Sequence, residues 1–396
     1  NRSAPRRDRT HSLSVYSSPA QRRARMAMKV LAAASLSSLA AGVYIRTPTP
    51  LVAPVSWEEA RAKAKQTLQE LTPDEKGDLV KGSHSYSPGW YVGNTKPIER
   101  MGIPALTMQD AGNGFRPHLP GTLGSTTMWP CGLALAATWD EVLVETVGAA
   151  MGREFSSKGA NVMLGPSVNV HRVARNGRNF EYMSGEDPYL GARMVKPFIR
   201  GVQSQGVIAT AKHYAFNEQE TNRGGKNASS SNVDARTAWE LYYPPFAAAV
   251  EADVGAFMCS YNKVNGTSAC ENSGILKRDL KGAMGFRGFV MSDWGATHST
   301  KAVTTGLDQD MPGGGMGGDK LFLATQLMVR YPQATDEAVV RVLSVIYKMR
   351  LDKSNGCQPP KCMSAMLANV RSKESTELAS RAARRSIVLL KNEGGM

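Results

Sequence analysis

The stretch Gly288-Phe289-Val290-Met291-Ser292-Asp293-Trp294-Gly295 decides the fold. A short apolar run in it ends abruptly in an acid and an aromatic residue, which is the pattern of a buried strand with a polar carboxyl end. Four other short apolar runs of the same kind precede it, at Pro104–Met108, Val162–Val170, Val207–Lys212 and Ala256–Tyr261.

Stretches with helical periodicity separate these runs. We expect helices at Trp57–Leu71, from Pro73 onward, and at Asp140–Lys158, Ala192–Gln205, Ala235–Ala252 and Ile275–Met284. Strands that alternate with helices over so long a stretch predict an α/β protein with a parallel sheet.

Polar residues follow nearly every predicted strand. The clusters are Gln109-Asp110, Asn169-Val170-His171-Arg172, Lys212-His213, Ser260-Tyr261-Asn262 and Ser292-Asp293-Trp294. An open doubly wound sheet gathers its ligands near one switch point, whereas a barrel builds its site from strand ends around the whole ring. Five contributing strands therefore favour a (β/α)8 TIM-type barrel.

The chemistry of these clusters suits a carbohydrate. Asp293 is a candidate nucleophile, and Trp294 offers a flat face for a sugar ring, although a lone barrel aspartate is more often a salt bridge or helix cap. Lys212 and His213 can grip hydroxyl groups and keep a carboxylate ionised. Asp110 can accept from two hydroxyls and Arg172 donates from a planar fork, and acid, base and aromatic groups together indicate a sugar site.

Four motifs resemble glycoside hydrolase family 3, especially its β-glucosidases, in order from about residue 60 to the last residue. They are Gly177-Arg178-Asn179-Phe180-Glu181-Tyr182 with Glu186-Asp187-Pro188, Lys212 to Glu220, Cys259 to Gly266, and Ser292-Asp293-Trp294-Gly295-Ala296. The segment Ala111-Gly112-Asn113-Gly114 departs from the family's usual Gly-Pro form, which leaves the loop after Asp110 undefined.

The resemblance implies a role for each matching residue. Asp293 takes the nucleophile position, and the sugar-binding positions fall on Asp110, Arg172, Lys212 and His213. Tyr261 would lie against the nucleophile, Trp294 would form the aromatic wall, and Met258 is a further candidate. We assign Arg178, Glu181 and Glu220 to structural ion pairs.

The implied activity is hydrolysis of terminal β-D-glucosyl residues from a β-linked oligosaccharide or an aryl or alkyl glucoside, with no metal or organic cofactor. Residues 216–222 lack the Gly-His loop that supplies the acid in one branch of the family. In the other branch a glutamate of a second α/β-sandwich domain supplies it, so we expect a truncated second domain and poor hydrolysis. The alternatives are a binding-only, inactive barrel and a β-xylosidase of the same family.

The expected organisation is a basic arm at 1–25, a signal peptide or membrane anchor at 26–45, a linker at 46–56, the barrel at 57–370 and the start of the second domain at 371–396. The run Ser386–Leu390 reads as a strand whose partner would lie in a continuing chain. We expect secretion, with membrane anchoring or organelle targeting as alternatives, and the oligomeric state stays open.

The net charge of +14 does not indicate nucleic-acid binding. Residues 1–46 hold nine Arg or Lys against Asp8 alone, so the rest is only mildly basic. Five cysteines suit a secreted enzyme; the candidate disulfide pairs are Cys259 with Cys270 and Cys357 with Cys362, and no spacing matches a zinc site. The glycosylation sequons include those that begin at Asn227 and Asn265.

Overall fold

A curled sheet of six short strands runs through the part of the chain that the computed structural model describes, residues 54–83, 88–225, 227–313, 321–354 and 356–394. The strands, in spatial order, are β1 (Gly93–Asn94), β2 (Thr107–Gln109), β3 (Val162–Met163), β4 (Ile208–Tyr214), β6 (Ala256–Cys259) and β9 (Phe289–Ser292). β1 pairs with β2 antiparallel, and every later pairing is parallel. The carboxyl ends of the parallel strands therefore meet at one edge.

Backbone hydrogen bonds continue beyond β9 and lead back to β1. The amide of Ser292 donates to Gln309 O at 2.9 Å, and the amide of Asp310 donates to Val80 O at 2.9 Å. The amide of Ser83 then donates to Asn94 O at 2.6 Å, in β1. Short extended segments near residues 309 and 81 thus join the last strand of the sheet to the first.

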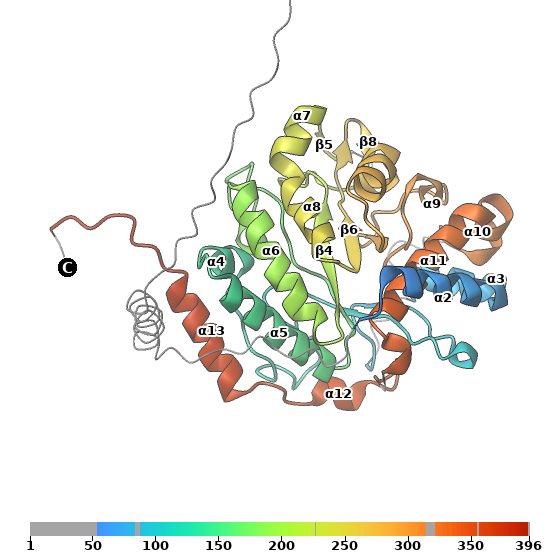
Figure 1. The fold of residues 1–396 in the computed structure, drawn as a ribbon, viewed down its shortest axis with the longest axis horizontal. Coiled ribbons are helices and arrows are strands. Elements are labelled where there is room, and N and C mark those ends of the chain that lie inside the picture. Colours follow the sequence, from blue (N-terminus) through green and yellow to red (C-terminus); the bar gives the residue numbers. More distant parts are fainter. Residues whose placement is uncertain (1–53, 84–87, 226, 314–320, 355, 395–396) are drawn as a thin grey trace, which may run out of the picture. The chain divides into compact units, whose positions relative to one another are not determined.

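Helices cover the outside of this sheet (Figure 1). α5 and α6 run side by side in Figure 1 and pack together, α6 also contacts α8, and α2 packs on α11. The helices are α2 (Trp57–Glu70), α3 (Pro73–Val80), α4 (Gly132–Ala136), α5 (Glu141–Ser157), α6 (Pro188–Gln203), α7 (Ala235–Thr237), α8 (Pro244–Glu251), α9 (Ala302–Thr305), α10 (Ala324–Arg330), α11 (Pro332–Lys348), α12 (Met363–Leu367) and α13 (Lys373–Arg385). This arrangement of sheet and helices confirms the predicted α/β class.

Sequence signals explain where the helices begin. The hydroxyl of Thr72 accepts from the amide of Glu75 while Glu75 accepts from the amide of Thr72, a capping box that starts α3. The carboxylates of Asp140 and Asp187 cap the starts of α5 and α6, where they accept from the amides of Leu143 and Tyr189. All seven residues of β4 are buried, as expected for a strand covered on both faces.

Two predicted helices differ from regular α-helices in the structure. The helix expected at 235–252 consists of α7, the π-helical turn η3 (Ala238–Tyr242) and α8. Pro244 and Pro245 lack amide hydrogens, so the helical hydrogen-bond ladder cannot run through them and a new helix begins there. The helix expected at 275–284 is π-helical, η5 (Gly274–Ala283).

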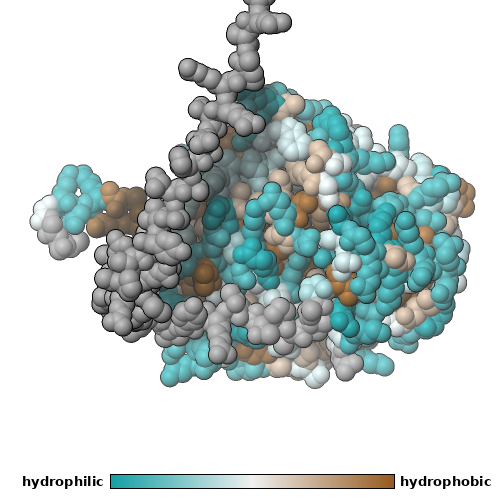
Figure 2. All heavy atoms as spheres, in the orientation of Figure 1, coloured by the Kyte–Doolittle hydropathy of each residue, from teal (hydrophilic) through white to brown (hydrophobic). Residues whose placement is uncertain are grey.

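The run 386–390, predicted as a strand whose partner would lie in a continuing chain, has no strand partner among the described residues. Residues 386–390 follow the end of α13 without pairing, and Ile387, Val388, Leu389 and Leu390 are all exposed. Figure 2 shows apolar side chains grouped on the tail beyond α13. A strand needs a neighbour for its amide and carbonyl groups, and none of the described segments lies beside it.

The predictions for the basic arm at 1–25, for the signal peptide or anchor at 26–45 and for most of the linker at 46–56 concern residues outside the described part of the chain. Among the helices of the described residues, none combines the length and apolar character that a bilayer crossing requires.

Candidate active site

The predicted strand ends meet at a pocket of about 290 Å³. Asp293 follows β9, Lys212 and His213 belong to β4, Met258 belongs to β6 and Asp110 follows β2. The lining is completed by Val92, Leu164, Arg178, Arg223, Tyr261 and Trp294. A pocket of this size lies at the lower end of the range of small-molecule sites, which begins at about 300 Å³, and so suits a small ligand.

Asp293 is held with one carboxylate oxygen fixed and the other free. Its Oδ1 accepts from the amide of Trp294 at 2.8 Å, while Oδ2 is buried and has no hydrogen-bond partner among the described residues. Burial raises the pKa of Asp293 above its ordinary value, although the Trp294 amide and Lys212 act in the opposite direction. The free oxygen is therefore available to a ligand in the pocket.

Two cations, Lys212 and Arg178, act on the carboxylate of Asp293, and both are paired with Glu181. Lys212 Nζ lies 4.0 Å from Glu181 Oε2, and the guanidinium of Arg178 pairs with Glu181 Oε1. Burial would raise the pKa of Glu181, but Lys212 and Arg178 outweigh it and hold that pKa below its usual value. Glu181 thus stays ionised and fixes the two cations that face Asp293.

His213 presents a neutral ring to the pocket. Burial lowers the pKa of His213 well below its ordinary value, and Arg178 and Lys212 add to the effect. The guanidinium of Arg178 donates to Nε2 at 3.2 Å, which favours the tautomer whose Nδ1 bears the hydrogen and donates to the Tyr182 hydroxyl at 2.9 Å. Nε2 also lies 3.7 Å from Asp293 Oδ2.

Asn169, in the irregular segment between β3 and α6, fixes the backbone of His213. Its Oδ1 accepts from the His213 amide at 2.8 Å, and its Nδ2 donates to His213 O at 3.1 Å. Nδ2 also donates to Glu218 Oε1 at 3.2 Å, and burial raises the pKa of Glu218 to about 8. A protonated, buried Glu218 therefore supports the residue that positions His213.

Tyr261 and Trp294 form one wall of the pocket. The Tyr261 hydroxyl donates to Trp294 O at 3.0 Å, and the Trp294 indole donates to Val92 O at 3.2 Å. Arg223 lies over the Tyr261 ring at 4.4 Å from its centroid. Burial raises the pKa of Tyr261, and the carboxylate of Asp293 adds to the shift. Both aromatic side chains are held in place by these contacts.

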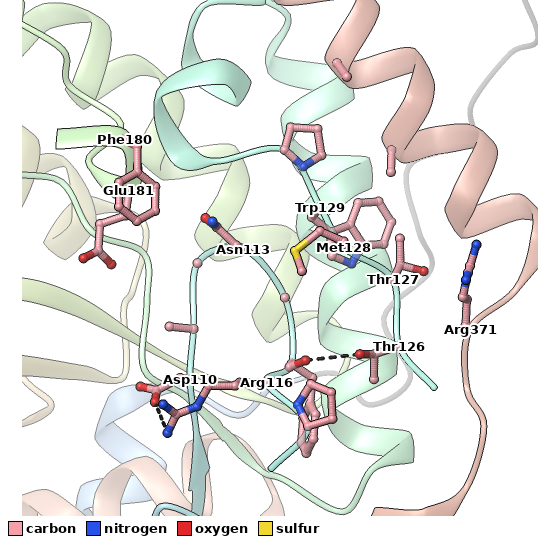
Figure 3. A pocket seen from close by; sticks show the side chains of 18 of the residues that line it. Asp110, Asn113, Arg116, Thr126, Thr127, Met128, Trp129, Phe180, Glu181 and Arg371 are labelled. Carbon is pink, nitrogen blue, oxygen red and sulfur yellow. Dashed lines mark hydrogen bonds and ion pairs between the residues drawn. The ribbon is translucent and has the colours of Figure 1, made fainter. Parts of the chain in front are cut away.

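Asp110 stands where the pocket opens into a larger groove of about 1150 Å³ (Figure 3). Asp110, Arg178 and Lys212 line both spaces. Asp110 pairs with Arg116 at 2.8 Å, which points the carboxylate along the loop that forms one wall of the groove. The other wall includes Arg371 and one face of α13.

Arg172 is the exception among the predicted site residues. It is exposed, lines neither space and acts electrostatically on Tyr242. The structure places Arg178 at the pocket, where it also forms the expected ion pairs with Glu181 and Glu220. Residues 171–178 form an irregular segment, so the chain reverses after Arg172 and returns at Arg178.

Arg223, Leu164 and Val92 were also missed. Arg223 follows the Lys212-His213 motif on a loop with no strand or helix periodicity, and the two apolar residues carry no chemical signal. The one hint in the sequence is the spacing of Arg223 from Glu220, with which it forms an ion pair at 2.7 Å.

Two disulfides lie in the described residues. Cys259, at the end of β6, is bonded to Cys270 with a Cα–Cα distance of 5.2 Å, which braces the loop that carries Tyr261. Cys357 is bonded to Cys362 with a Cα–Cα distance of 5.3 Å. No group of three or more potential metal ligands occurs in the described residues.

Comparisons with known proteins agree with this geometry. The family model described as "Glycosyl hydrolase family 3 N terminal domain" matches residues 91–310. A curated relative named "Probable beta-glucosidase L", from Emericella nidulans, is 41% identical over 356 residues, which are 86% of this chain and 46% of the relative. "Beta-glucosidase cel3A" of Pyricularia oryzae is 41% identical over 349 residues, again 86% and 46%.

Solved structures show the same likeness. The Beta-D-glucoside glucohydrolase of Trichoderma reesei superposes with a TM-score of 0.76 at 37% identity, covering 85% of this chain and 46% of that one. Beta-glucosidase 3B of Thermotoga neapolitana, solved with glucose, gives a TM-score of 0.73 at 32% identity, covering 84% and 48%. The chain spans about half the length of the curated relatives it matches. It belongs to glycosyl hydrolase family 3.

Proposed function

We propose that this chain is the nucleophile-bearing part of a retaining β-glucosidase that acts on terminal β-D-glucosyl units. The observation that supports the proposal most strongly is the buried, unpartnered Oδ2 of Asp293, which faces a sugar-sized pocket beside Lys212 and Arg178. The names of the relatives and the glucose-bound neighbour support glucose as the sugar.

In the proposed reaction Asp293 Oδ2 forms a bond to the anomeric carbon while the bond from that carbon to the leaving oxygen breaks. The electron pair of the broken bond stays on the leaving oxygen, which takes up a proton. Water then attacks the anomeric carbon of the glycosyl–aspartate ester and gives up one proton, which replaces the proton taken up by the leaving oxygen, and glucose and the free carboxylate are released. The Trp294 amide, bonded to Oδ1 at 2.8 Å, keeps the carboxylate oriented throughout.

The sugar hydroxyls would be held by the charged groups on the other side of the pocket. Asp110 would accept hydrogen bonds, while Lys212 and Arg178 would donate them. His213, whose two ring nitrogens are engaged by Arg178 and Tyr182, would hold Arg178 in place, and Trp294 would pack against the apolar face of the pyranose.

The proton donor would be a residue outside this lining. Asp110 and Asp293 are the carboxylic acids among the lining residues, and Asp110 is engaged by Arg116 at 2.8 Å. The family resemblance implies a glutamate of a second domain for this task. Loss of general acid assistance costs about 10²–10⁴-fold, so the chain alone should act best on glucosides with good leaving groups.

We also propose that the curled sheet is a (β/α)8-type barrel. The hydrogen bonds that lead from Ser292 through Asp310 to Ser83 and on to β1 support closure of the ring. Secretion is a further proposal, supported by the two disulfides, because such bonds persist in oxidising compartments.

The test is a comparison of two glucosides and one xyloside by NMR. We expect slow release of β-glucose, the retained anomer, from a dinitrophenyl β-glucoside, much slower release from an alkyl β-glucoside, and less from the matched xyloside. Initial formation of α-glucose, or glucose binding without turnover of any substrate, would overturn the proposal. The second outcome would favour a binding-only barrel.

A further inference from the structure

Two sequons in the described residues carry the same modification signal but lie in different surroundings. One is Asn227-Ala228-Ser229 on the loop after β4, and the other is Asn265-Gly266-Thr267 between β7 (Lys263–Val264) and β8 (Thr267–Ser268). Neither belongs to the proposed reaction. Both asparagines are exposed, so exposure alone does not separate them.

The side-chain amide of Asn265 is already used by the fold. Its Oδ1 accepts from the Val233 amide at 2.9 Å, and its Nδ2 donates to Val233 O at 3.0 Å. Because both bonds go to one residue, they leave from the same edge of the amide. This paired contact ties the β7–β8 turn to the segment before α7.

A glycan on Asn265 would break this contact. Glycosylation turns the amide into a secondary amide, and secondary amides prefer the trans form by about 2.5 kcal/mol. In that form the sugar carbon lies on the same side as Oδ1. This is the position of the hydrogen that Asn265 Nδ2 now donates to Val233 O. The sugar and the Val233 carbonyl would therefore compete for one position.

Asn227 has no such conflict. It is exposed on a turn, and its side chain makes no hydrogen bond with any part of the chain that the structure describes. The next residue, Ala228, is buried and anchors the loop, and the backbone carbonyl of Ser229 accepts from the Lys263 amide at 2.9 Å. The loop is thus held by its neighbours while the Asn227 amide stays free.

We propose that Asn227 is an N-glycosylation site of this protein and that Asn265 is not. In the transfer, Asn227 Nδ2 forms a bond to the anomeric carbon of a lipid-linked oligosaccharide diphosphate. The bond from that carbon to the diphosphate oxygen breaks, the diphosphate leaves with the electron pair, and Nδ2 loses one proton. The proposal is independent of the hydrolytic function and concerns a different reaction, carried out on the chain by its host.

Asn227 lies on a loop that also contributes a residue to the active-site pocket. Arg223, on the same loop, lines the pocket and covers the Tyr261 ring at 4.4 Å. Asn227 itself does not line the pocket, so removing its glycan should leave hydrolysis of a small aryl glucoside within about 2-fold of its rate.

The test is glycopeptide mapping of the full chain, secreted from a eukaryotic host under a cleavable leader. Enzymatic release of glycans in heavy-oxygen water converts each occupied asparagine into labelled aspartate, which peptide mass spectrometry locates. We expect label at Asn227 and none at Asn265. Label at Asn265, or an Asn227 peptide without label, would overturn the proposal.

Matched variants separate the sequon from the fold. Ser229→Ala and Asn227→Gln should each remove the glycan at Asn227, whereas Thr267→Ala destroys the Asn265 sequon, keeps the Asn265 contacts and should leave the Asn227 glycan in place. A shift in mobility on loss of Thr267, with none on loss of Ser229, would contradict the assignment even if one variant folded poorly.

Discussion

The small pocket at Asp293 and the wide groove next to it share Asp110, Arg178 and Lys212, yet they are built differently. The pocket, of about 290 Å³, is lined by buried charged groups that hold one another by ion pairs and hydrogen bonds. The groove, of about 1150 Å³, is lined largely by side chains of a loop and of α13, and its Leu123 and Met128 are 86% and 82% exposed.

This difference in lining indicates that the reactive groups are held in the small pocket and not in the groove. Burying a charge without partners is costly, so the cluster of Lys212, Arg178 and Glu181 persists because its members neutralise one another. The exposed side chains of the groove are in contact with solvent and do not need such charge pairing. Substitutions in the pocket should therefore change catalysis strongly, while substitutions on the groove surface should change it little.

Replacement of Asp293 gives the largest expected effect. Asp293→Asn should lower the rate on dinitrophenyl β-glucoside by at least about 10³-fold, because the amide cannot attack the anomeric carbon. Asp293→Gly should regain turnover with added azide and release α-glucosyl azide, which NMR identifies. Activity of the asparagine variant near that of the parent would show that the reactive group lies elsewhere.

The two arginines near the pocket provide the next contrast. Arg178→Met removes charged hydrogen bonds worth about 1.5–3 kcal/mol, so kcat/KM should fall about 10- to 100-fold. Arg172→Met is the matched control, since Arg172 is exposed and outside the pocket, and should stay within about 2-fold. Equal losses in the two variants would mean that Arg172 reaches the substrate.

Lys212 should set the acid limb of the pH profile. Burial raises the pKa of Asp293 and Lys212 counteracts it, so removal of the cation makes ionisation harder. In Lys212→Met the acid limb of kcat/KM should move to higher pH, whatever the loss in rate. An acid limb that stays in place or moves to lower pH would argue against electrostatic support of Asp293 by Lys212.

The groove should give the smallest effect. Leu123→Ser and Met128→Ser alter strongly exposed side chains and should change kcat/KM for a small aryl glucoside by less than about 2-fold, with Tm nearly unchanged. A loss comparable to that of Arg178→Met would remove the distinction between the two regions and assign the groove a direct role in binding.

Much of the fold could be predicted because the apolar runs are short and regularly spaced. β4, β6 and β9 lie within or beside the predicted runs. The predicted strand 162–170 is regular only at Val162–Met163, because Pro166 has no amide hydrogen to donate, and pairing with β4 resumes at the bridge between Ser167 and Lys212. Ser386–Leu390 is unpaired among the described residues, and its strand, whose partner was expected in a continuing chain, stays a prediction.

The site was predictable where a residue ends a regular strand, as Lys212, Met258 and Asp293 do. Strand direction brings such residues to one edge whatever the loops do. Arg178 could not be separated from Arg172 in this way, since both lie in an irregular segment with no period to fix their directions. Only the folded path of that segment shows which guanidinium faces Asp293.

The most direct test of the central claim is to trap the covalent intermediate. The chain is incubated with 2,4-dinitrophenyl 2-deoxy-2-fluoro-β-glucoside, whose fluorine slows hydrolysis of the ester, and the labelled peptide is sequenced by mass spectrometry. The account predicts one fluoroglucosyl group per chain, attached to Asp293 and absent from Asp293→Asn. A label on any other residue would contradict it.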